Sequence, residues 1–378
     1  MTTKWLSSCV GAVSSVHRSH YAGVRLTSIA FANRQIRTYA TQKAEQKSDL
    51  DRPEKAALVE IQGLRKGDVI NPPRSTRPPT LKLPEQGDAN VALYYFKIGR
   101  AYGSFYWVGI KAVWFNYKAA KLLKERYAKE LGASGKDFRS ERALQSLTRS
   151  EFQLLERNNY DIGKLPFFGL LVALFGEWLP LIVPFIPGAV PGTCRIPKQI
   201  EGMRKKAEER RKTSFRQGVE EPQGAQIMLE VEPSEKPVEK TWPAIEENYA
   251  RQLLAQLRDD QLLHLSSSLN LHSRLWDRLQ IAPPSSLLRK AIARRLQYLT
   301  CDDRLLAGSP SAPKTLTTEE VHIACDERGI DVLGNREEVL RATLHYWLER
   351  QKKDEGKGSA ILKMLFRRPN AWETQKEA

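Results

Sequence analysis

The sequence predicts an all-α protein in which a single proline-rich transmembrane helix is followed by a helical domain. Strand-like alternation of apolar and polar residues is scarce along the 378 residues. Residues 165–194 carry a single charge, Glu177, and are rich in proline, which suits a lipid environment better than the core of a soluble protein. After this stretch, helix start and stop signals recur around amphipathic segments, as expected of a bundle of helices.

The net charge favours an anionic partner. The chain has 60 Lys and Arg residues against 44 Asp and Glu, a formal charge of +16, and this balance favours RNA or acidic lipid. The four cysteines are scattered, without a CxxC spacing or a neighbouring histidine pair. The sequence therefore predicts neither a disulfide framework nor a zinc site, and no cofactor is expected.

Residues 1–39 have the composition of a mitochondrial transit peptide. The first 44 residues are rich in basic, Ser and Thr side chains and contain no Asp or Glu. The sequence "RTYA" predicts processing after Tyr39. The alternative is a disordered basic tail. Residues 40–90, which include "NPPRSTRPPT", are predicted to form a disordered linker.

Residues 91–160 are predicted to form an amphipathic helical region at the membrane interface. The first 27 of these residues include ten aromatic side chains, and Lys97, Arg100 and Lys111 keep the uncharged runs too short to cross a bilayer. Basic helices rich in aromatic residues suit the headgroup layer. The alternative is a soluble aromatic-rich helix that packs on protein.

Residues 161–192 are predicted to be the transmembrane segment. The 22 residues from Leu165 to Ile186 would extend about 33 Å as a helix, close to the ~30 Å of a hydrocarbon core. Pro180 and Pro184 predict a kink in its second half. The alternative is a buried hairpin in a soluble protein.

The charges that flank this segment predict its orientation. Residues 195–216 contain nine basic and three acidic side chains, whereas residues 143–164 contain three of each. Because positive charge accumulates on the inner side of a membrane, the C-terminal side is expected in the matrix. The predicted location is the mitochondrial inner membrane, crossed once.

The remainder is predicted to comprise a basic helix with a Pro/Glu-rich connector at 193–243, a helical domain at 244–365 and a tail at 366–378. Within the domain, Pro284 is expected to start a helix that runs to about Leu306. Further cap signals are the pairs Thr148 with Glu151, Thr317 with Glu320 and Asn335 with Glu338, and a stop signal at Gly329.

Several of these segments resemble the LETM-domain family of mitochondrial inner-membrane proteins. "LTRSEFQLLERNNYDIGKLPFF", "PGAVPGT" and "IPKQ" are similar to the membrane region of that family. "ARRLQYLTCDDRLLA", "LTTEEVHIACDERGI" and "LGNREEVLRATLHYWL" resemble its matrix-facing, ribosome-binding-like domain. The resemblance covers roughly residues 95–365, and its most specific feature is the succession of the aromatic segment, the proline-rich span and the DD, RG and WL motifs.

The resemblance implies two activities, which are monovalent cation/proton homeostasis and the docking of mitochondrial ribosomes. The chain looks like the short form of the family, without the extended coiled coil and the EF-hand. Its nearest candidate loop, residues 326–337, has Arg328 and Ile330 at the third and fifth positions, where calcium requires oxygen ligands. Calcium binding is therefore not expected.

Glu177 lies near the middle of the predicted span, where an ionised carboxylate is costly. One interpretation is an ion path in which Glu177 accepts a proton or cation beside Pro180 and Pro184. That path would require a homo-oligomer, because a single helix cannot enclose a pore. The alternative is a packing group that is protonated, or bonded to a carbonyl that Pro180 frees.

The helix that starts after Pro284 carries the predicted ribosome contact. At 100° per residue, Lys290 and Arg294 lie together on the face opposite the apolar residues, where they could bind RNA phosphates. The alternative is a basic face that is only solvated. Arg295 falls on the apolar face and is predicted to form a structural ion pair with Asp302, two turns later.

No phosphate-binding loop, HExxH pair or nucleophile elbow is found, so the chain is not expected to be an enzyme. The sequence predicts an inner-membrane protein whose matrix domain binds mitochondrial ribosomes, through RNA or protein, and supports membrane-protein insertion and mitochondrial homeostasis. The alternative is a component or regulator of potassium/proton exchange that controls ion and volume homeostasis. The second predicted partner is inner-membrane lipid.

Overall fold

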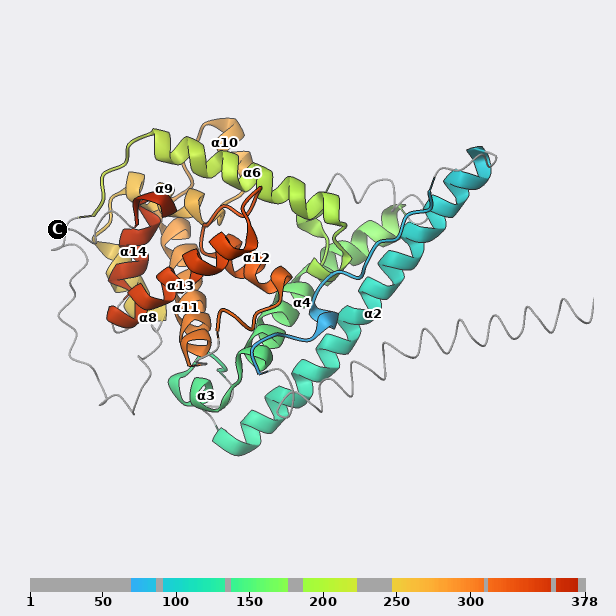
Figure 1. Cartoon of the computed structure of the whole chain (residues 1–378), viewed down its shortest axis with the longest axis horizontal. Helices are drawn as coiled ribbons and strands as arrows, with labels where there is room; N and C mark the ends of the chain where they lie inside the picture. Colours follow the sequence, from blue (N-terminus) through green and yellow to red (C-terminus); the bar gives the residue numbers. More distant parts are fainter. Residues whose placement is uncertain are drawn as a thin grey trace, which may run out of the picture. The chain divides into compact units, whose positions relative to one another are not determined.

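The computed structural model describes residues 69–85, 91–132, 137–175, 186–222, 247–308, 312–354 and 358–372. All of them belong to one compact unit, Ala56–Ala378. Within these ranges the chain forms eleven α-helices and four short 3₁₀ helices, and no strand, which confirms the all-α prediction (Figure 1). The predicted transit peptide lies outside the described residues.

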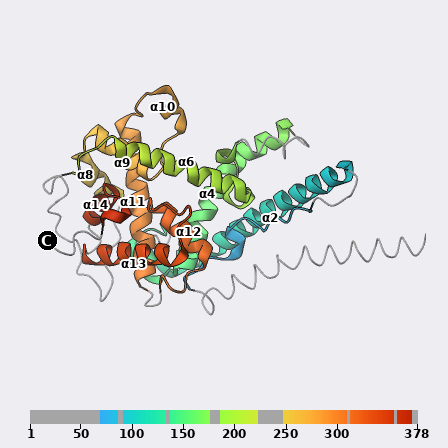
Figure 2. The same ribbon diagram turned by 45° about the horizontal axis from the view of Figure 1, so that its top comes forward.

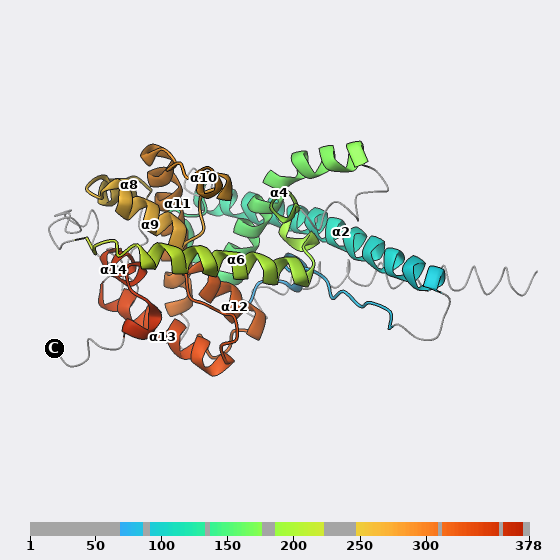
Figure 3. The same ribbon diagram turned by 90° about the horizontal axis from the view of Figure 1, so that it is seen from above.

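Two long helices form an antiparallel pair, which we call the α2–α4 arm (Figure 3). The helices of this part are α2 (Val91–Leu131), α3 (Glu141–Ser146) and α4 (Arg149–Phe175). Phe105 in the first half of α2 shares a buried cluster with Phe168 in the second half of α4. Leu123 in the second half of α2 shares another buried cluster with Leu154 in the first half of α4. The aromatic region therefore packs on protein along one side.

The start of α4 agrees with the predicted capping box. The Glu151 N–H donates to Thr148 Oγ1 at 3.2 Å, and the Thr148 N–H donates to Glu151 Oε2 at 3.1 Å. From this cap the helix continues without a break to Phe175. The predicted boundary between the interfacial region and the transmembrane segment, at residues 160 and 161, therefore lies inside one helix.

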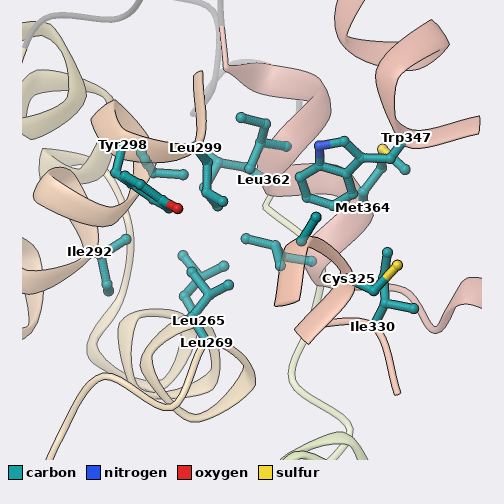
Figure 4. Close-up of a cluster of buried hydrophobic side chains, with 14 of the residues drawn as sticks. Leu265, Leu269, Ile292, Tyr298, Leu299, Cys325, Ile330, Trp347, Leu362 and Met364 are labelled. Atoms are coloured by element: carbon teal, nitrogen blue, oxygen red, sulfur yellow. The ribbon is translucent and has the colours of Figure 1, made fainter. Parts of the chain in front are cut away.

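A second group of helices follows the arm (Figure 2). They are α6 (Pro197–Arg216), α8 (Glu247–Ala255), α9 (Asp259–Ser268), α10 (Arg274–Leu279), α11 (Ser285–Ala307), α12 (Thr318–Glu327), α13 (Glu337–Lys353) and α14 (Ser359–Leu365). Helix α11 is central, since it contacts α8, α9, α13 and also α4. Ile292 and Leu299 of α11 are fully buried in the same core as Trp347 and Leu362 (Figure 4).

Two predicted helix ends in this group are confirmed. Helix α11 begins at Ser285, directly after Pro284, and ends at Ala307. Gly329 follows α12 with a φ of 77°, and its N–H bonds to the carbonyl of Asp326 at 3.1 Å. The N–H of Ile330 bonds to Cys325 O at 3.0 Å. This pair of bonds is the Schellman motif, which glycine favours because it adopts a positive φ without strain.

The other two predicted capping boxes do not form. Thr317 is the N-cap residue of α12, as predicted, but its side chain forms no cap bond, and Glu320 is fully buried against arginines of other segments. Helix α13 begins at Glu337 with Arg336 as its N-cap, so Asn335 lies one residue too early. Asn335 instead donates to the carbonyl of Asp331 at 2.8 Å. In both cases a side chain that was predicted to cap a helix, Glu320 or Asn335, binds another segment or a nearby loop instead.

Part of the predicted disordered linker is folded against the helices. Residues 69–85 include the 3₁₀ turn η1 (Arg74–Thr76) and the buried Ile70. The Asn71 side chain donates to Thr315 O and accepts the Thr317 N–H, both at 2.9 Å. The linker prediction is therefore wrong for these residues, because the polar side chains of this proline-rich stretch are bonded to distant segments.

The start of the predicted tail is also part of the core. Trp372 follows the 3₁₀ turn η7 (Pro369–Ala371) and is only 6% exposed. Its indole N–H donates to Met364 O at 3.0 Å, and its ring lies 5.8 Å from that of Trp347. The helical domain therefore extends past the predicted end at residue 365.

The predicted transmembrane segment begins and ends at the same place. The turns η5 (Pro187–Ala189) and η6 (Gly192–Cys194) pack against the arm. The Gly192 N–H donates to Asp161 Oδ1 at 2.6 Å, and Lys164 Nζ donates to Gly188 O at 2.7 Å. A helix that crosses a bilayer once has its ends about 30 Å apart. The described ends of the segment therefore lie close together, and the prediction of a single crossing is not confirmed.

In the part of the chain that the structure describes, no helix is both long enough and apolar enough to span a membrane. Residues 176–185, which belong to the predicted segment, lie outside that part.

Candidate functional site

The second half of α11 contains two adjacent, fully buried aspartates, Asp302 and Asp303. Arg328, which follows α12, donates to both of them, with Nη2 at 2.7 Å from Asp302 Oδ2 and Nε at 2.9 Å from Asp303 Oδ1. The indole N–H of Trp347 on α13 donates to Asp303 Oδ2 at 2.8 Å. These four side chains therefore join α11, α12 and α13.

The same aspartate joins the helical domain to the arm. Arg149 Nε on α4 lies 2.8 Å from Asp302 Oδ1, and Gln153 Nε2 donates to that oxygen at 2.7 Å. Arg149 Nη1 also donates to the carbonyl of Ile70 at 3.0 Å. Asp302 thus accepts hydrogen bonds from both sides, and the segment before α2 is bonded into the same network.

Glu320 of α12 forms a second buried link to the arm. Arg157 on α4 binds it with two parallel bonds, Nη1 to Oε1 and Nη2 to Oε2, both 2.8 Å. Arg77, from the segment before α2, approaches Glu320 Oε1 at 3.7 Å. Bidentate pairs of this kind fix the relative orientation of their elements.

The network changes the pKa of each carboxyl group according to its partners. Burial raises the pKa of Asp302, but Arg149 and Arg328 outweigh burial and hold the pKa below its usual value. Burial likewise raises the pKa of Glu320, and Arg157, together with Arg149 and Arg77, more than reverses that change. Burial raises the pKa of Asp303, whose one arginine partner does not compensate fully. Asp302 and Glu320 are therefore the carboxylates that the buried arginines stabilise most.

The predicted ion pair between Arg295 and Asp302 is wrong. Asp302 binds Arg149 and Arg328 instead, and the Arg295 guanidinium lies over the ring of Tyr298, 5.3 Å from its centroid. Two helical turns separate positions 295 and 302 by about 10 Å, a distance that the two side chains can bridge only if no closer partner competes. Asp302 found closer partners on other segments, whereas Arg295 contacts Tyr298 three residues later on α11 itself.

Lys290 and Arg294 lie where the helical periodicity predicts them. Both are exposed on α11, opposite the buried Ile292 and Leu296. Arg294 is 57% exposed and makes one loose ion pair, 3.8 Å from Glu247 Oε1. Pairs of this kind contribute little in water, so a phosphate could replace the glutamate. We call these two side chains the α11 basic face.

A second exposed basic surface lies on α6, which packs on α9 (Figure 2). Arg210 and Arg211 point inward, where Arg211 Nε donates to Ser268 O at 3.0 Å. Exposed bases share the outer face of the helix at spacings of seven and four residues, and we call them the α6 basic row: Lys198, Lys205, Lys212 and Arg216. Because exposed Glu201 and Glu209 interrupt the row, its net charge is modest.

The residues of the predicted ion path, Glu177, Pro180 and Pro184, lie outside the described residues. In the loop compared with an EF-hand, Arg328 is bound to the two aspartates of α11. Over the described ranges, no group of three or more His, Cys, Asp and Glu side chains is arranged to hold a metal ion.

Sequence reasoning identified the motifs of the buried network but not their contacts. The DD, RG and WL motifs are Asp302 with Asp303, Arg328 with Gly329, and Trp347 with Leu348, and Arg328 and Trp347 both donate to Asp303. The roles of Arg149 and Arg157 were missed. The available signal was the position of these two arginines in a helix whose neighbouring residues are apolar, such as Phe152, Leu154 and Leu155.

One of three comparisons with known proteins found a match. A family model described as LETM1-like, RBD, the ribosome-binding domain, matches residues 147–366. The searches of curated proteins and of solved structures returned no match. The matched range covers more than half of the chain and includes α4, α11, α12 and α13, the helices that the buried network joins. The chain therefore belongs to the LETM1-like ribosome-binding-domain family.

Proposed function

We propose that the chain is a mitochondrial inner-membrane protein that binds the mitochondrial ribosome through the helical domain and holds it beside the membrane. The match to the ribosome-binding-domain family over residues 147–366 carries this proposal. Binding of this kind would place the ribosome close to the site where newly made membrane proteins insert. The net charge of +16 is consistent with a partner rich in RNA.

We assign the contact to the α11 basic face. Lys290 and Arg294 are exposed, and neither contributes to the core that holds α11 in place. Leu287, one turn before Lys290, is 55% exposed and would add an apolar contact to the same surface. Phosphate oxygens would replace the loose partner of Arg294, Glu247, with the release of counterions from the RNA.

Sedimentation of the purified full chain with mitochondrial ribosomes, at low and high salt, tests this proposal. We expect Lys290→Glu with Arg294→Glu to reduce the bound fraction at least fivefold at low salt. The slope of log affinity against log salt should fall by about two, one for each phosphate contact. The melting temperature should stay unchanged, because both side chains are exposed.

The matched control is Lys205→Glu with Lys212→Glu, which makes the same change of charge on the α6 basic row. It should retain more than half of the binding. Equal loss in the two variants would mean that only net charge matters, and loss in the control alone would move the contact to α6. If the unmodified chain did not sediment with the ribosomes, the proposed function itself would be overturned.

A further inference from the structure

Hydrogen bonds join parts of the chain that precede and follow the apolar segment 161–192. Before the segment, Asn71 Nδ2 donates to Thr315 O at 2.9 Å, and Arg149 Nε lies 2.8 Å from Asp302 Oδ1. A side chain cannot form such bonds across a hydrocarbon core of ~30 Å. The parts of the chain before and after the segment must therefore lie on the same side of any bilayer that it enters.

The described ends of the segment lie beside each other. Lys164 bonds to the carbonyl of Gly188 at 2.7 Å. From Lys164 to Phe175, α4 rises by about 16 Å, which is about half of a ~30 Å hydrocarbon core. The described part of the segment is thus long enough to reach the middle of a bilayer.

The ends of the arm expose an unusual amount of apolar surface. One side of α4 is buried through Phe168 and Leu171. Its other side exposes Phe167, Leu170, Val172, Leu174 and Phe175, and the first turns of α2 expose Val91, Leu93, Tyr95 and Phe96. In Figures 1 and 3 both helix ends lie on the side of the unit away from α8, α13 and α14. Exposed apolar side chains that gather in this way mark an interaction surface.

The charges along α2 indicate which partner covers that surface. Residues 91–124 contain six basic residues and no Asp or Glu. Lys111 Nζ lies over the ring of Trp107 at 5.4 Å, and Lys118 Nζ over the ring of Trp114 at 5.3 Å. Both indoles are 55% exposed. Exposed indoles beside lysines suit the headgroup layer of a membrane, and the excess of positive charge favours anionic lipid.

We propose that the chain is a monotopic membrane protein, in which the exposed apolar face of the α2–α4 arm enters one leaflet of an anionic bilayer and leaves it on the same side. The described residues before the segment, 69–160, then share a compartment with those that follow it. This arrangement does not depend on ribosome binding, so each proposal can fail without the other.

Cysteine accessibility in mitoplasts tests the sidedness. Lys121→Cys places a thiol on the exposed side of α2, before the apolar segment, and Lys205→Cys places one on α6, after it. A maleimide that cannot cross the inner membrane should label neither variant until detergent is added. The unmodified chain is the control, because the described native thiols, Cys194, Cys301 and Cys325, are buried.

The proposal would be overturned if the Lys121→Cys variant were labelled in intact mitoplasts while the Lys205→Cys variant stayed protected. That result would require the chain to cross the membrane between the two positions. Labelling of both variants would support entry and exit on one side. It would at the same time contradict the matrix location of the ribosome-binding domain.

Vesicle flotation tests the surface. Full-length chain should float with phosphatidylcholine vesicles that contain 20% cardiolipin, and less with phosphatidylcholine alone. Leu170→Asp with Leu174→Asp should reduce flotation at least tenfold. The matched control is Leu275→Asp with Leu279→Asp, which changes two equally spaced exposed leucines of α10 and should leave flotation unchanged. Equal effects of the two pairs, or no effect of the first, would overturn the assignment of the arm.

Discussion

Arg149 of α4 lies 2.8 Å from Asp302 of α11, so the arm is bonded directly to the central helix of the second group of helices. On its other side Asp302 binds Arg328, 2.7 Å away. Asp302 and Arg328 are fully buried, and Arg149 is 1% exposed. Because an uncompensated buried charge is expensive, this junction is stable only when all three side chains are present.

Removing the shared carboxylate should destabilise the protein strongly. Asp302→Asn keeps the size of the side chain but leaves Arg149 and Arg328 without their common counter-charge. We expect the free energy of unfolding to fall by about 3–5 kcal/mol, the usual effect of breaking a buried pair on one side. Chemical denaturation of the purified chain in detergent, followed by circular dichroism, measures this change.

Arg295 should matter much less than the sequence alone suggests. Its guanidinium contacts the ring of Tyr298 and does not pair with Asp302. Arg295→Gln should therefore cost about 1 kcal/mol, the size of a cation–π contact. A loss as large as that of Asp302→Asn would contradict the observed partners and would favour the predicted pair.

Two glycines of α2 should respond in opposite directions to alanine. A Cβ atom on Gly109 would lie 2.8 Å from Thr193 O and from Cys194 Sγ, whereas one on Gly103 would meet no atom within 4 Å. Gly103→Ala should stabilise α2 by up to about 1 kcal/mol through helix propensity. Gly109→Ala should lower the melting temperature, because η6 must move away. Equal shifts would mean that the close approach of η6 does not matter.

Two of the predicted caps, Thr148 and Thr317, should also differ on substitution. Thr148→Ala removes a bond that the structure contains and should cost about 1 kcal/mol. Thr317 makes no cap bond, and its hydroxyl accepts only from Arg77 at 3.2 Å near the surface. Thr317→Ala should therefore cost less than half as much in the same denaturation experiment. The reverse order would show that the caps are assigned wrongly.

The buried histidines should make the protein less stable in mild acid. His264 is buried between the rings of Phe215 and Phe366, and burial lowers its pKa below 6.5. Below pH 6.5 the unfolded chain therefore binds more protons than the folded chain, so the free energy of unfolding decreases until the pH passes the folded pKa. Burial lowers the pKa of His272 and His322 in the same direction.

His264→Gln should remove part of this dependence. The measurement is the difference in unfolding free energy between about pH 7.5 and pH 5.5, for the unmodified chain and the variant. A smaller difference in the variant is expected, whereas an unchanged one would exclude His264 as a contributor.

The sequence by itself determined the features that depend on neighbours within one or two turns. The helix from Ser285 to Ala307, the Thr148 cap and the stop at Gly329 all follow from residues a few positions apart. The outward position of Lys290 and Arg294 follows from the 100° rotation per residue. Local geometry is sufficient for these features because backbone bonds in a helix join near neighbours.

Only the tertiary structure decided which charges pair and where the apolar segment leads. Asp302 had a possible partner, Arg295, two turns away on the same helix. It binds Arg149 instead, which lies 153 positions earlier in the chain. The ends of residues 161–192 meet through the bond between Asp161 and Gly192, although composition and length fit a single crossing equally well. Hydrophobicity determines that a segment avoids water. It carries no information about the direction in which the chain returns, because contacts between distant residues set that direction.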